Sequence, residues 1–478
     1  MRSADLAAAG AAHAESCAAA RAKGVVRGGT ALIGAGALLL TAAIVGLWQD
    51  VRWLSQPFYA FAWWGYILIA DGLCAAIRND SLLTTRRRWA AVLAVGSVTF
   101  WFCFEALNLR FRNWYYVEVF PVHNLVECLP AGLFAVVSFA TVFLGIFESF
   151  ELFGAFGLFA QWRGAGRVMG RSSGWVVQAI GVVMAVAAVV WPCYLAPLIW
   201  GSLSLIVDPW NARHGRSSLL ADLQRGEYGR CARWLVAGLW CGLLWESLNF
   251  WAPQKWIYTV RGLEELKLFE MPLLGFLGFP ALALDCVAAA SWYCAWLARG
   301  GHWEERGAIR AQIDERRFAR SLPVQMIFWC VIGYCVAHVN VGSVEVALLH
   351  LGLTEPEVAT LHRHEIRRPR HVLKLDAERS RKQAVLNALK WSEDRWDRLV
   401  ERSRLYTFKG IGARHGQMLE AIGVGSVADL ASYSPASLHE ALARGAAASD
   451  RDPPRLDMVR VWVIESHRRH GSSDRTME

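Results

Sequence analysis

The sequence predicts an all-α membrane protein: a polytopic bundle of two tandem four-helix repeats with eight or nine transmembrane helices, and a small C-terminal helical domain. Of its 478 residues, 55% are hydrophobic, and they gather in runs of about 18 or more, long enough to cross a bilayer as helices. A Glu-x-x-Asn pattern ends two of these runs, at Glu105 and Asn108 and again at Glu246 and Asn249. Two such patterns with matched flanks indicate internal duplication.

The flanks of the two patterns agree over most of each repeat. A Trp-x-Tyr sequence follows each pattern, at residues 114–116 and 256–258. Upstream, an Asp precedes Ser-Leu-Leu by the same spacing in both halves, and downstream an acid lies in the last apolar run of each half. These acids are Asp71 and Asp208 upstream, and Glu148 and Asp285 downstream. The sequence therefore predicts repeats over residues 25–162 and 170–299.

Four apolar runs in each repeat are expected to form transmembrane helices. They cover residues 30–48, 57–77, 89–109 and 130–159 in the first repeat, and 175–191, 194–207, 235–251 and 271–297 in the second. An even number of spans gives both repeats the same orientation in the membrane. A further run at 322–353 begins apolar and is then interrupted by polar residues, so it is either a ninth crossing or a re-entrant or interfacial segment.

The net charge of +9 reports membrane topology more than nucleic-acid binding. Basic residues gather in alternate loops, at 86–88, 163–171, 225–233 and 299–310, and such loops face the cytoplasm. This pattern predicts a multi-pass protein of the bacterial inner membrane, with the bilayer as its first partner and residues 1–24 as a cytoplasmic N-terminal segment. The spacing of its Cys and His residues supports no disulfide framework and no metal site, and no motif identifies a cofactor.

The acids in the apolar runs are the first candidates for a functional site. A carboxylate at the centre of a membrane helix costs about 2.5–3.5 kcal/mol on insertion scales, so it normally faces a protein interior or a wet cavity. Residues three apart share a helix face, which lets each Glu and Asn point into one site. We therefore expect acidic groups at Glu105, Glu246, Glu148 and Asp285, and ligand contacts from Asn108, Asn249, Trp114, Tyr116, Trp256, Tyr258 and Glu270. Alternatively, the acids only fix helix packing through hydrogen bonds.

The membrane part also resembles known proteins. Residues 50–300, with a Leu-Trp-Glu-x-x-Asn-Phe segment and the segment 269–280, resemble a group of uncharacterised duplicated bacterial membrane proteins. Their general plan is similar to that of lycopene-cyclase-type carotenoid enzymes, although the Pro-x-Glu motif of those enzymes is absent here. That similarity implies an intramembrane enzyme whose protonated Glu residues act on a lipophilic or isoprenoid substrate. A proton- or cation-coupled transporter would use the same acids.

The C-terminal part has a different composition. Residues 362–404 are rich in both charge signs and are expected to form a helical linker, followed by a domain over 405–470. Lys409-Gly410-Ile411-Gly412 before an expected helix resembles the helix-hairpin-helix family, which implies phosphate contacts from Lys409, Gly410, Ile411, Gly412 and Arg414. The alternative is a protein-binding module. Either partner would make the chain a membrane-tethered scaffold or sensor; the oligomeric state is not predicted.

Overall fold

The computed structural model describes residues 2–120, 125–166, 171–260, 266–298, 302–304, 313–448 and 452–473. These residues form two compact units. The first unit comprises Met1–Phe111, Gly132–Pro253 and Leu273–Tyr334, and the second Arg112–Ala131, Gln254–Pro272 and Cys335–Glu478. Parts of the predicted basic loops at 163–171 and 299–310 lie outside the described residues. The described chain is mainly helical, as predicted, with four short strands.

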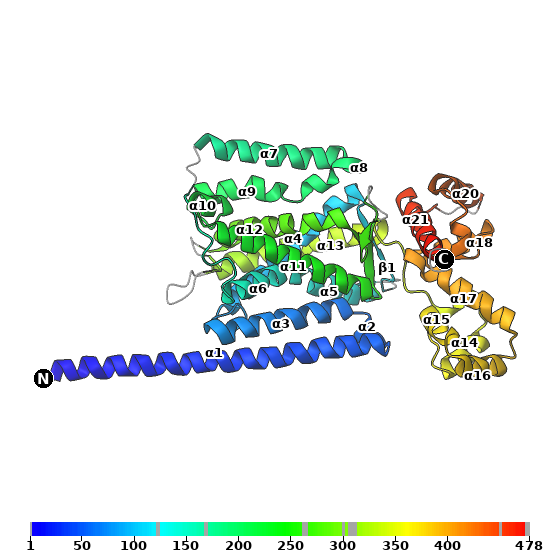
Figure 1. The fold of residues 1–478 in the computed structure, drawn as a ribbon, viewed down its shortest axis with the longest axis horizontal. Helices are drawn as coiled ribbons and strands as arrows, with labels where there is room; N and C mark the ends of the chain where they lie inside the picture. The colour runs from blue at the N-terminus through cyan, green and yellow to red at the C-terminus, as the bar shows by residue number, and fades with distance from the viewer. Residues whose placement is uncertain are drawn as a thin grey trace. The chain divides into compact units, whose positions relative to one another are not determined.

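The first unit is a bundle of long apolar helices. Within it, α1 packs on α3, α3 on α6 and α4 on α6, while α7 packs on α9, α9 on α12 and α11 on α12. Figure 1 shows α1 running along α3 and α7 running along α9. The bounds are α1 Arg2–Trp48, α2 Arg52–Ser55, α3 Phe58–Arg78, α4 Arg87–Phe111, α5 Leu125–Phe139, α6 Thr141–Ala155, α7 Arg171–Val190, α8 Pro192–Leu195, η1 Ala196–Ile199, α9 Ser202–Arg213, α10 Leu219–Gln224, α11 Tyr228–Trp251, η2 Leu273–Leu277, α12 Gly278–Leu297 and α13 Glu315–Val339.

Seven helices in the described part of the chain are long and apolar enough to cross a membrane. Two predicted spans are not among them. The run 194–207 is broken into α8, η1 and the 12-residue α9, and α11 is long enough but carries Glu246, Asn249 and several Trp, which lower its hydropathy. The seven are Gly24–Trp48, Phe58–Arg78, Arg87–Phe111, Leu129–Ala155, Ser172–Val190, Leu273–Leu297 and Glu315–Val339.

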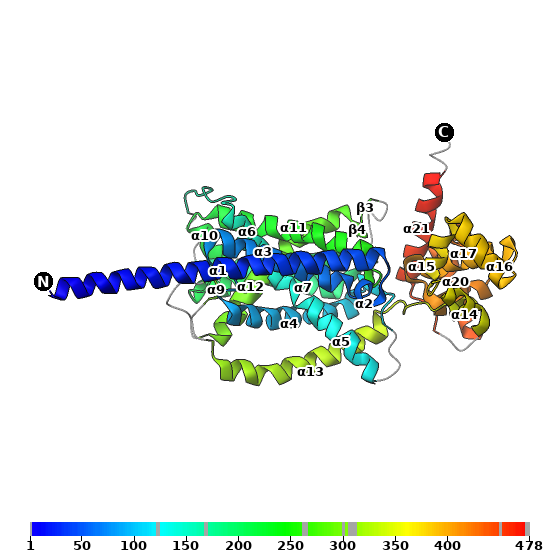
Figure 2. The same ribbon diagram turned by 90° about the horizontal axis from the view of Figure 1, so that it is seen from below.

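The last of these helices, α13, replaces the interrupted run predicted at 322–353. It is 25 residues long and lies beside α4 (Figure 2), where Phe328, Trp329 and Ile332 pack against Val98 and Phe102. The polar residues that follow, from Asn340 onward, lie beyond its end in the second unit. Its length matches a full crossing of a bilayer.

The second unit has one hydrophobic core. Residues from Val346 to Val463 form it together with Tyr115, Val117 and Ile257, three residues from segments far upstream. The charged segment 362–404 contributes Trp396 and Leu399 to this core and so belongs to the packed unit. Its elements are η3 Leu348–Leu351, α14 Glu355–Arg363, α15 Pro369–Asp376, α16 Arg379–Leu389, α17 Glu393–Thr407, η4 Phe408–Gly410, α18 Gly412–Ala421, α19 Val427–Leu430, α20 Pro435–Ala448 and α21 Leu456–Ser473.

Strand β1 (Trp114–Val117) organises the upstream part of this unit. It pairs with β2 (Lys255–Tyr258) in antiparallel register, Trp114 opposite Tyr258 and Tyr116 opposite Trp256. On its other edge the Tyr116 N–H donates to Asn340 O at 2.8 Å, and the Gly342 N–H donates to Tyr116 O at 2.8 Å. A second pair of strands, β3 (Lys267–Leu268) and β4 (Met271–Pro272), forms a tight turn around Glu270. The two Trp-x-Tyr segments therefore pair with each other, and the first also pairs with the chain after α13.

Candidate functional site

An alternating chain of ion pairs connects the β3–β4 turn to the C-terminal helices within the second unit. Glu270 Oε1 lies 3.0 Å from Lys255 Nζ, and Glu270 Oε2 lies 2.7 Å from Lys409 Nζ. Lys409 also lies 3.7 Å from Glu465 Oε2, and Glu465 Oε1 accepts a hydrogen bond from Lys267 Nζ at 2.8 Å. Three cations and two carboxylates from four separate stretches of sequence thus meet in one network, which we call the ion-pair chain.

The carboxylates of the ion-pair chain are held ionised although they are buried. The side chain of Glu270 is only 1% exposed, and burial by itself would raise its pKa. Lys255 and Lys409 outweigh this effect and lower the pKa of Glu270 to about 2. Burial is likewise overcome at Glu465, whose pKa is lowered by Lys409 and Lys267. Both carboxylates are therefore ionised at neutral pH, and their ionisation depends on the neighbouring lysines.

The turn that carries Lys409 is also fixed through its backbone. Lys409 O accepts hydrogen bonds from the Tyr115 hydroxyl at 2.7 Å and from the Trp462 indole N–H at 3.1 Å. Lys409 has φ 42° and Gly410 has φ 74°, a left-handed region in which only Gly is unstrained. A Cβ on Gly410 would lie 2.2 Å from Cγ1 of Val117. The turn is pressed closely against β1.

These contacts bear on the expected nucleic-acid role of the turn. Gly410, Ile411 and Gly412 are buried, and a Cβ on Gly412 would lie 2.6 Å from Cβ of Ser343. Lys409 faces Glu270 and Glu465. Of the five residues implied by the family resemblance, Arg414 alone has an extensively exposed side chain, at 57%, and it donates to Asp452 O at 3.0 Å. The residues of the turn are thus packed against protein, and the Ile411 N–H donates to Phe408 O at 3.0 Å.

Glu105 and Glu246, the first two predicted acids, are fully buried in the helical bundle, as are Asn108 and Asn249. The Trp101 indole N–H donates to Glu105 Oε1 at 3.1 Å. The Trp101 ring lies 5.3 Å from that of Trp245, the residue before Glu246. The structure therefore brings the two Glu-x-x-Asn helices together through a Trp pair, with aromatic side chains around the acids.

The other two predicted acids, Asp285 and Glu148, have different surroundings. Asp285 accepts hydrogen bonds from the N–H groups of Gly201 and Ser204, at 2.8 and 2.7 Å. A carboxylate is favourable at this helix N-terminus, so Asp285 caps α9. Glu148 is fully buried and lies beside Asp71. Asp71 accepts a 2.7 Å hydrogen bond from the Ser81 hydroxyl and another from Leu83 N–H.

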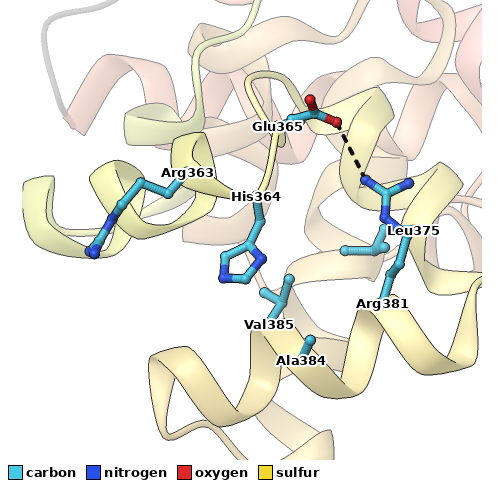
Figure 3. Close-up of a pocket in the computed structure, with 7 residues that line it drawn as sticks. All are labelled: Arg363, His364, Glu365, Leu375, Arg381, Ala384 and Val385. Carbon is cyan, nitrogen blue, oxygen red and sulfur yellow. Dashed lines mark ion pairs between the residues drawn. The ribbon is translucent and has the colours of Figure 1, made fainter.

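Among the described residues, two of the cavities lie within the C-terminal helices of the second unit. The smaller, of about 210 Å³, is shown in Figure 3: the His364 ring points toward Val385, and Glu365 forms a 3.8 Å ion pair with Arg381. The larger, of about 490 Å³, is bounded by one face of α17 together with Trp391 and Glu420. None of the predicted site residues lines either cavity. In the described part of the chain, no group of three His, Cys, Asp or Glu residues could hold a metal ion.

Comparison with protein families identifies one region of the chain. Residues 351–469 match a domain of unknown function, DUF4332. The DUF4332 match begins at the end of η3 and ends in α21, so it includes both the charged segment 362–404 and the turn of Lys409. No curated protein and no solved structure matched the chain. The match agrees with the continuous core found between Val346 and Val463.

Sequence reasoning missed three members of the ion-pair chain. Lys255 directly precedes the Trp-x-Tyr sequence at 256–258. A single cation near an apolar run is only a weak indication of a buried ion pair. Lys267 and Glu465 lie 198 positions apart in segments with many other charges, and no local pattern distinguishes them. The predicted Trp and Tyr residues lie together, but as strand neighbours in β1 and β2.

Proposed function

We propose that the chain crosses the membrane nine times and holds its DUF4332-like domain on the side opposite the N-terminus. The segments that contain β1 and β2 follow the third and seventh predicted crossings, and the C-terminal domain follows α13, the ninth. Because each crossing takes the chain to the other side of the membrane, segments that follow an odd number of crossings all lie on the same side. The backbone pairing of 341–344 with β1, together with the Lys409–Glu270 ion pair, supports this arrangement. With basic loops in the cytoplasm, that side is exoplasmic.

The same proposal includes the internal duplication. The helix contacts α1–α3, α3–α6 and α4–α6 correspond in order to α7–α9, α9–α12 and α11–α12. Asp208 accepts hydrogen bonds from the Ser218 hydroxyl and Leu220 N–H at 2.9 and 2.7 Å, as Asp71 does from Ser81 and Leu83. These equivalent contacts support two tandem repeats related by an axis along the membrane normal.

Within this architecture we propose that the protein is a membrane-anchored scaffold whose C-terminal domain recruits an acidic protein segment. The observation that carries the proposal is the burial of Gly410, Ile411 and Gly412, the residues that a phosphate would have to approach; Gly410 packs against Val117 and Gly412 against Ser343. We place the binding surface for this segment at the larger cavity, beside α17. There Arg395 stacks on Trp391 at 4.4 Å and pairs with Glu357, while Arg398 is exposed and has no ion pair in the described residues.

Topology is the first test of the proposal. A C-terminal reporter that is active in only one compartment should report the exoplasmic side, and a cytoplasmic signal would refute the nine-crossing arrangement. Deleting residues 405–478 should abolish partner recovery while the membrane part remains folded.

The recruiting surface is tested by a photo-crosslinker placed beside Arg398 in the intact protein. It should capture a segment rich in Asp and Glu, and Arg398→Glu should abolish the capture. Arg444→Glu, which changes a 70% exposed side chain of α20, is the control and should leave capture unchanged. Capture that survives Arg398→Glu would refute the proposal that the cavity beside α17 binds the acidic segment.

A second candidate function uses the buried acids. The Trp101–Trp245 contact brings the helices of Glu105 and Glu246 together, which favours a shared intramembrane site for a lipophilic or isoprenoid substrate. Glu105→Gln and Glu246→Gln should then each abolish turnover of a polyprenyl substrate in membranes. Full activity in both variants would exclude acid catalysis, whereas pH-dependent flux in proteoliposomes would instead indicate transport.

A further inference from the structure

Two carboxyl groups meet inside the helical bundle, between α3 and α6. Asp71 of α3 and Glu148 of α6 are both fully buried, and their side chains hydrogen-bond to each other. Asp71 accepts two further hydrogen bonds, from the Ser81 hydroxyl and from the Leu83 N–H, both at 2.7 Å. Neither oxygen of Glu148 accepts a hydrogen bond from an N–H or O–H donor in the described part of the chain. Glu148 is therefore the donor of the pair and Asp71 the acceptor.

A hydrogen bond between two carboxyl groups requires a proton on one of them. Two buried carboxylates in contact repel each other, so such a pair holds one proton between its members. The cation that faces the pair is Arg86, and it is bound by Asp80 and Glu151, at 3.1 and 3.4 Å. The positive charge of Arg86 is thus already shared by two other carboxylates, and a proton on Glu148 is what keeps the pair together.

The other titratable side chains around the pair are one carboxylate, one phenol and two thiols. Glu151 lies one turn further along α6, and Tyr66 and Cys74 face the pair from α3. From α11, Cys241 lies 3.1 Å from the hydroxyl of Ser149, the residue after Glu148. Phenol and thiol groups are ordinarily neutral at pH 7. None of these groups supplies a positive charge that would stabilise a second carboxylate.

Two hydroxyl groups lead from the pair toward the surface of the bundle. The Ser81 hydroxyl, which donates to Asp71, lies 2.6 Å from the Thr84 hydroxyl. Because the Ser81 proton is used on Asp71, Thr84 is the donor in this second hydrogen bond. Ser81 is buried, whereas Thr84 is partly exposed. We call these two groups the hydroxyl relay; both lie in the segment between α3 and α4, so the relay opens at that end of the bundle.

The second half of the bundle differs at both of these features. At the positions that correspond under the proposed duplication, Asp208 keeps the serine contact, at 2.9 Å, but Ala221 stands in place of Thr84. Asp285 stands in place of Glu148 and accepts hydrogen bonds from backbone N–H groups at the start of α9. A buried acid that only fixes helix packing can therefore do so without a second carboxyl group, and the carboxyl pair with its relay belongs to the first half.

We propose that Glu148 and Asp71 form a proton-binding site that exchanges its proton with water through the hydroxyl relay. To load the empty pair, a hydronium ion gives a proton to Thr84, Thr84 gives its own proton to Ser81, and Ser81 gives its own to Asp71. The proton then crosses to Glu148, and both hydroxyl groups are left as they were. Acidic side chains inside membrane bundles relay protons in pumps and transporters. The site goes beyond the proposed scaffold role, because it needs only the helical bundle.

Infrared spectroscopy of the full-length protein in nanodiscs tests the site, since a protonated carboxyl group and a carboxylate absorb at different frequencies. At neutral pH the wild type should show a protonated-carboxyl band that Glu148→Gln removes. Glu148→Gln should fold, because its amide N–H can donate to Asp71 as the acid does. Glu315→Gln, which changes a 72% exposed carboxylate, is the control and should leave the band unchanged. A spectrum of Glu148→Gln that retains the whole band would overturn the proposal.

Deuterium exchange of the same band tests the relay. In heavy water the band shifts as deuterium replaces the proton, and Thr84→Val should slow this shift by about tenfold, the effect of one lost hydrogen bond. Thr85→Val is the matched control, because the Thr85 hydroxyl donates to Asp80 and to Ser81 O, outside the relay; its exchange should match the wild type. Equal exchange rates in Thr84→Val and wild type would overturn the proposal. This measurement uses the native carboxyl pair, so it decides the proposal even where Glu148→Gln does not fold.

Discussion

Lys409 and Glu270 lie 139 positions apart in the sequence and form a 2.7 Å hydrogen-bonded ion pair. Glu270 lies in the turn between β3 and β4, and Lys409 lies where α17 gives way to α18. The pair is therefore a direct link between the segment that lies between α11 and α12 in the sequence and the C-terminal helices. Both residues belong to the ion-pair chain. Removing the charge of either one therefore leaves a buried partner of opposite charge without this ion pair.

Replacing Glu270 by Gln should destabilise the second unit strongly. Lys255 and Lys409 would lose their shared carboxylate, and breaking a buried ion pair costs roughly 3 kcal/mol. Limited proteolysis of the full-length protein should show faster cleavage between α17 and α18, and thermal unfolding of the unit should occur at lower temperature. Glu440→Gln is the control, because that carboxylate is 72% exposed and its exposed pair contributes little. Equal behaviour of the two variants would contradict the role of Glu270.

Acid should weaken the same unit over a defined range of pH. The pKa of Glu270 is about 2 in the folded protein, below its ordinary value of 4.5. A lowered pKa gives stability that is complete above the unfolded value and is lost as pH falls through the folded one. Unfolding measured between pH 7 and 2 should show little change down to about pH 4.5 and a progressive loss below it. In Glu270→Gln this acid-dependent loss should be smaller.

The sequence predicted the helical class from local patterns, because hydrophobic runs are recorded in neighbouring residues. It did not predict that residues 114–117 and 255–258 pair as strands, since pairing partners 138 to 144 positions apart leave no local signal. Lys409 was found through a turn motif, but its partner depends on tertiary structure. Asp285 was recognised as an unusual buried acid, yet its role as the cap of α9 follows only from how α9 and α12 pack.

Comparing Gly410→Ala with Gly423→Ala should separate the destabilisation caused by close packing from that caused by backbone strain. Gly410 and Gly423 both have left-handed φ, 74° and 85°, but a Cβ at Gly423 meets nothing within 4 Å, whereas at Gly410 it meets Val117. Both variants should lose about 1 kcal/mol or more from strain, and Gly410→Ala should lose about 1–3 kcal/mol more from overpacking. Denaturant unfolding measures this difference. Adding Val117→Ala should recover part of the loss in Gly410→Ala, and equal losses in the two single variants would refute the tight contact.

Close packing of α1 on α3 predicts a further contrast, between two glycines of α1. A Cβ on Gly36 would lie 2.6 Å from Gly65 O of α3, whereas at Gly34 it would meet nothing within 4 Å. Small residues let membrane helices approach closely, so Gly36→Val should push α1 away from α3 while Gly34→Val leaves it in place. Cysteine crosslinking between α1 and α3 in membranes measures this separation. Gly36→Val should lose most of the crosslink, and Gly34→Val should retain it because its added side chain points away from α3. Retention of the crosslink in Gly36→Val would show that α1 is not held by this contact.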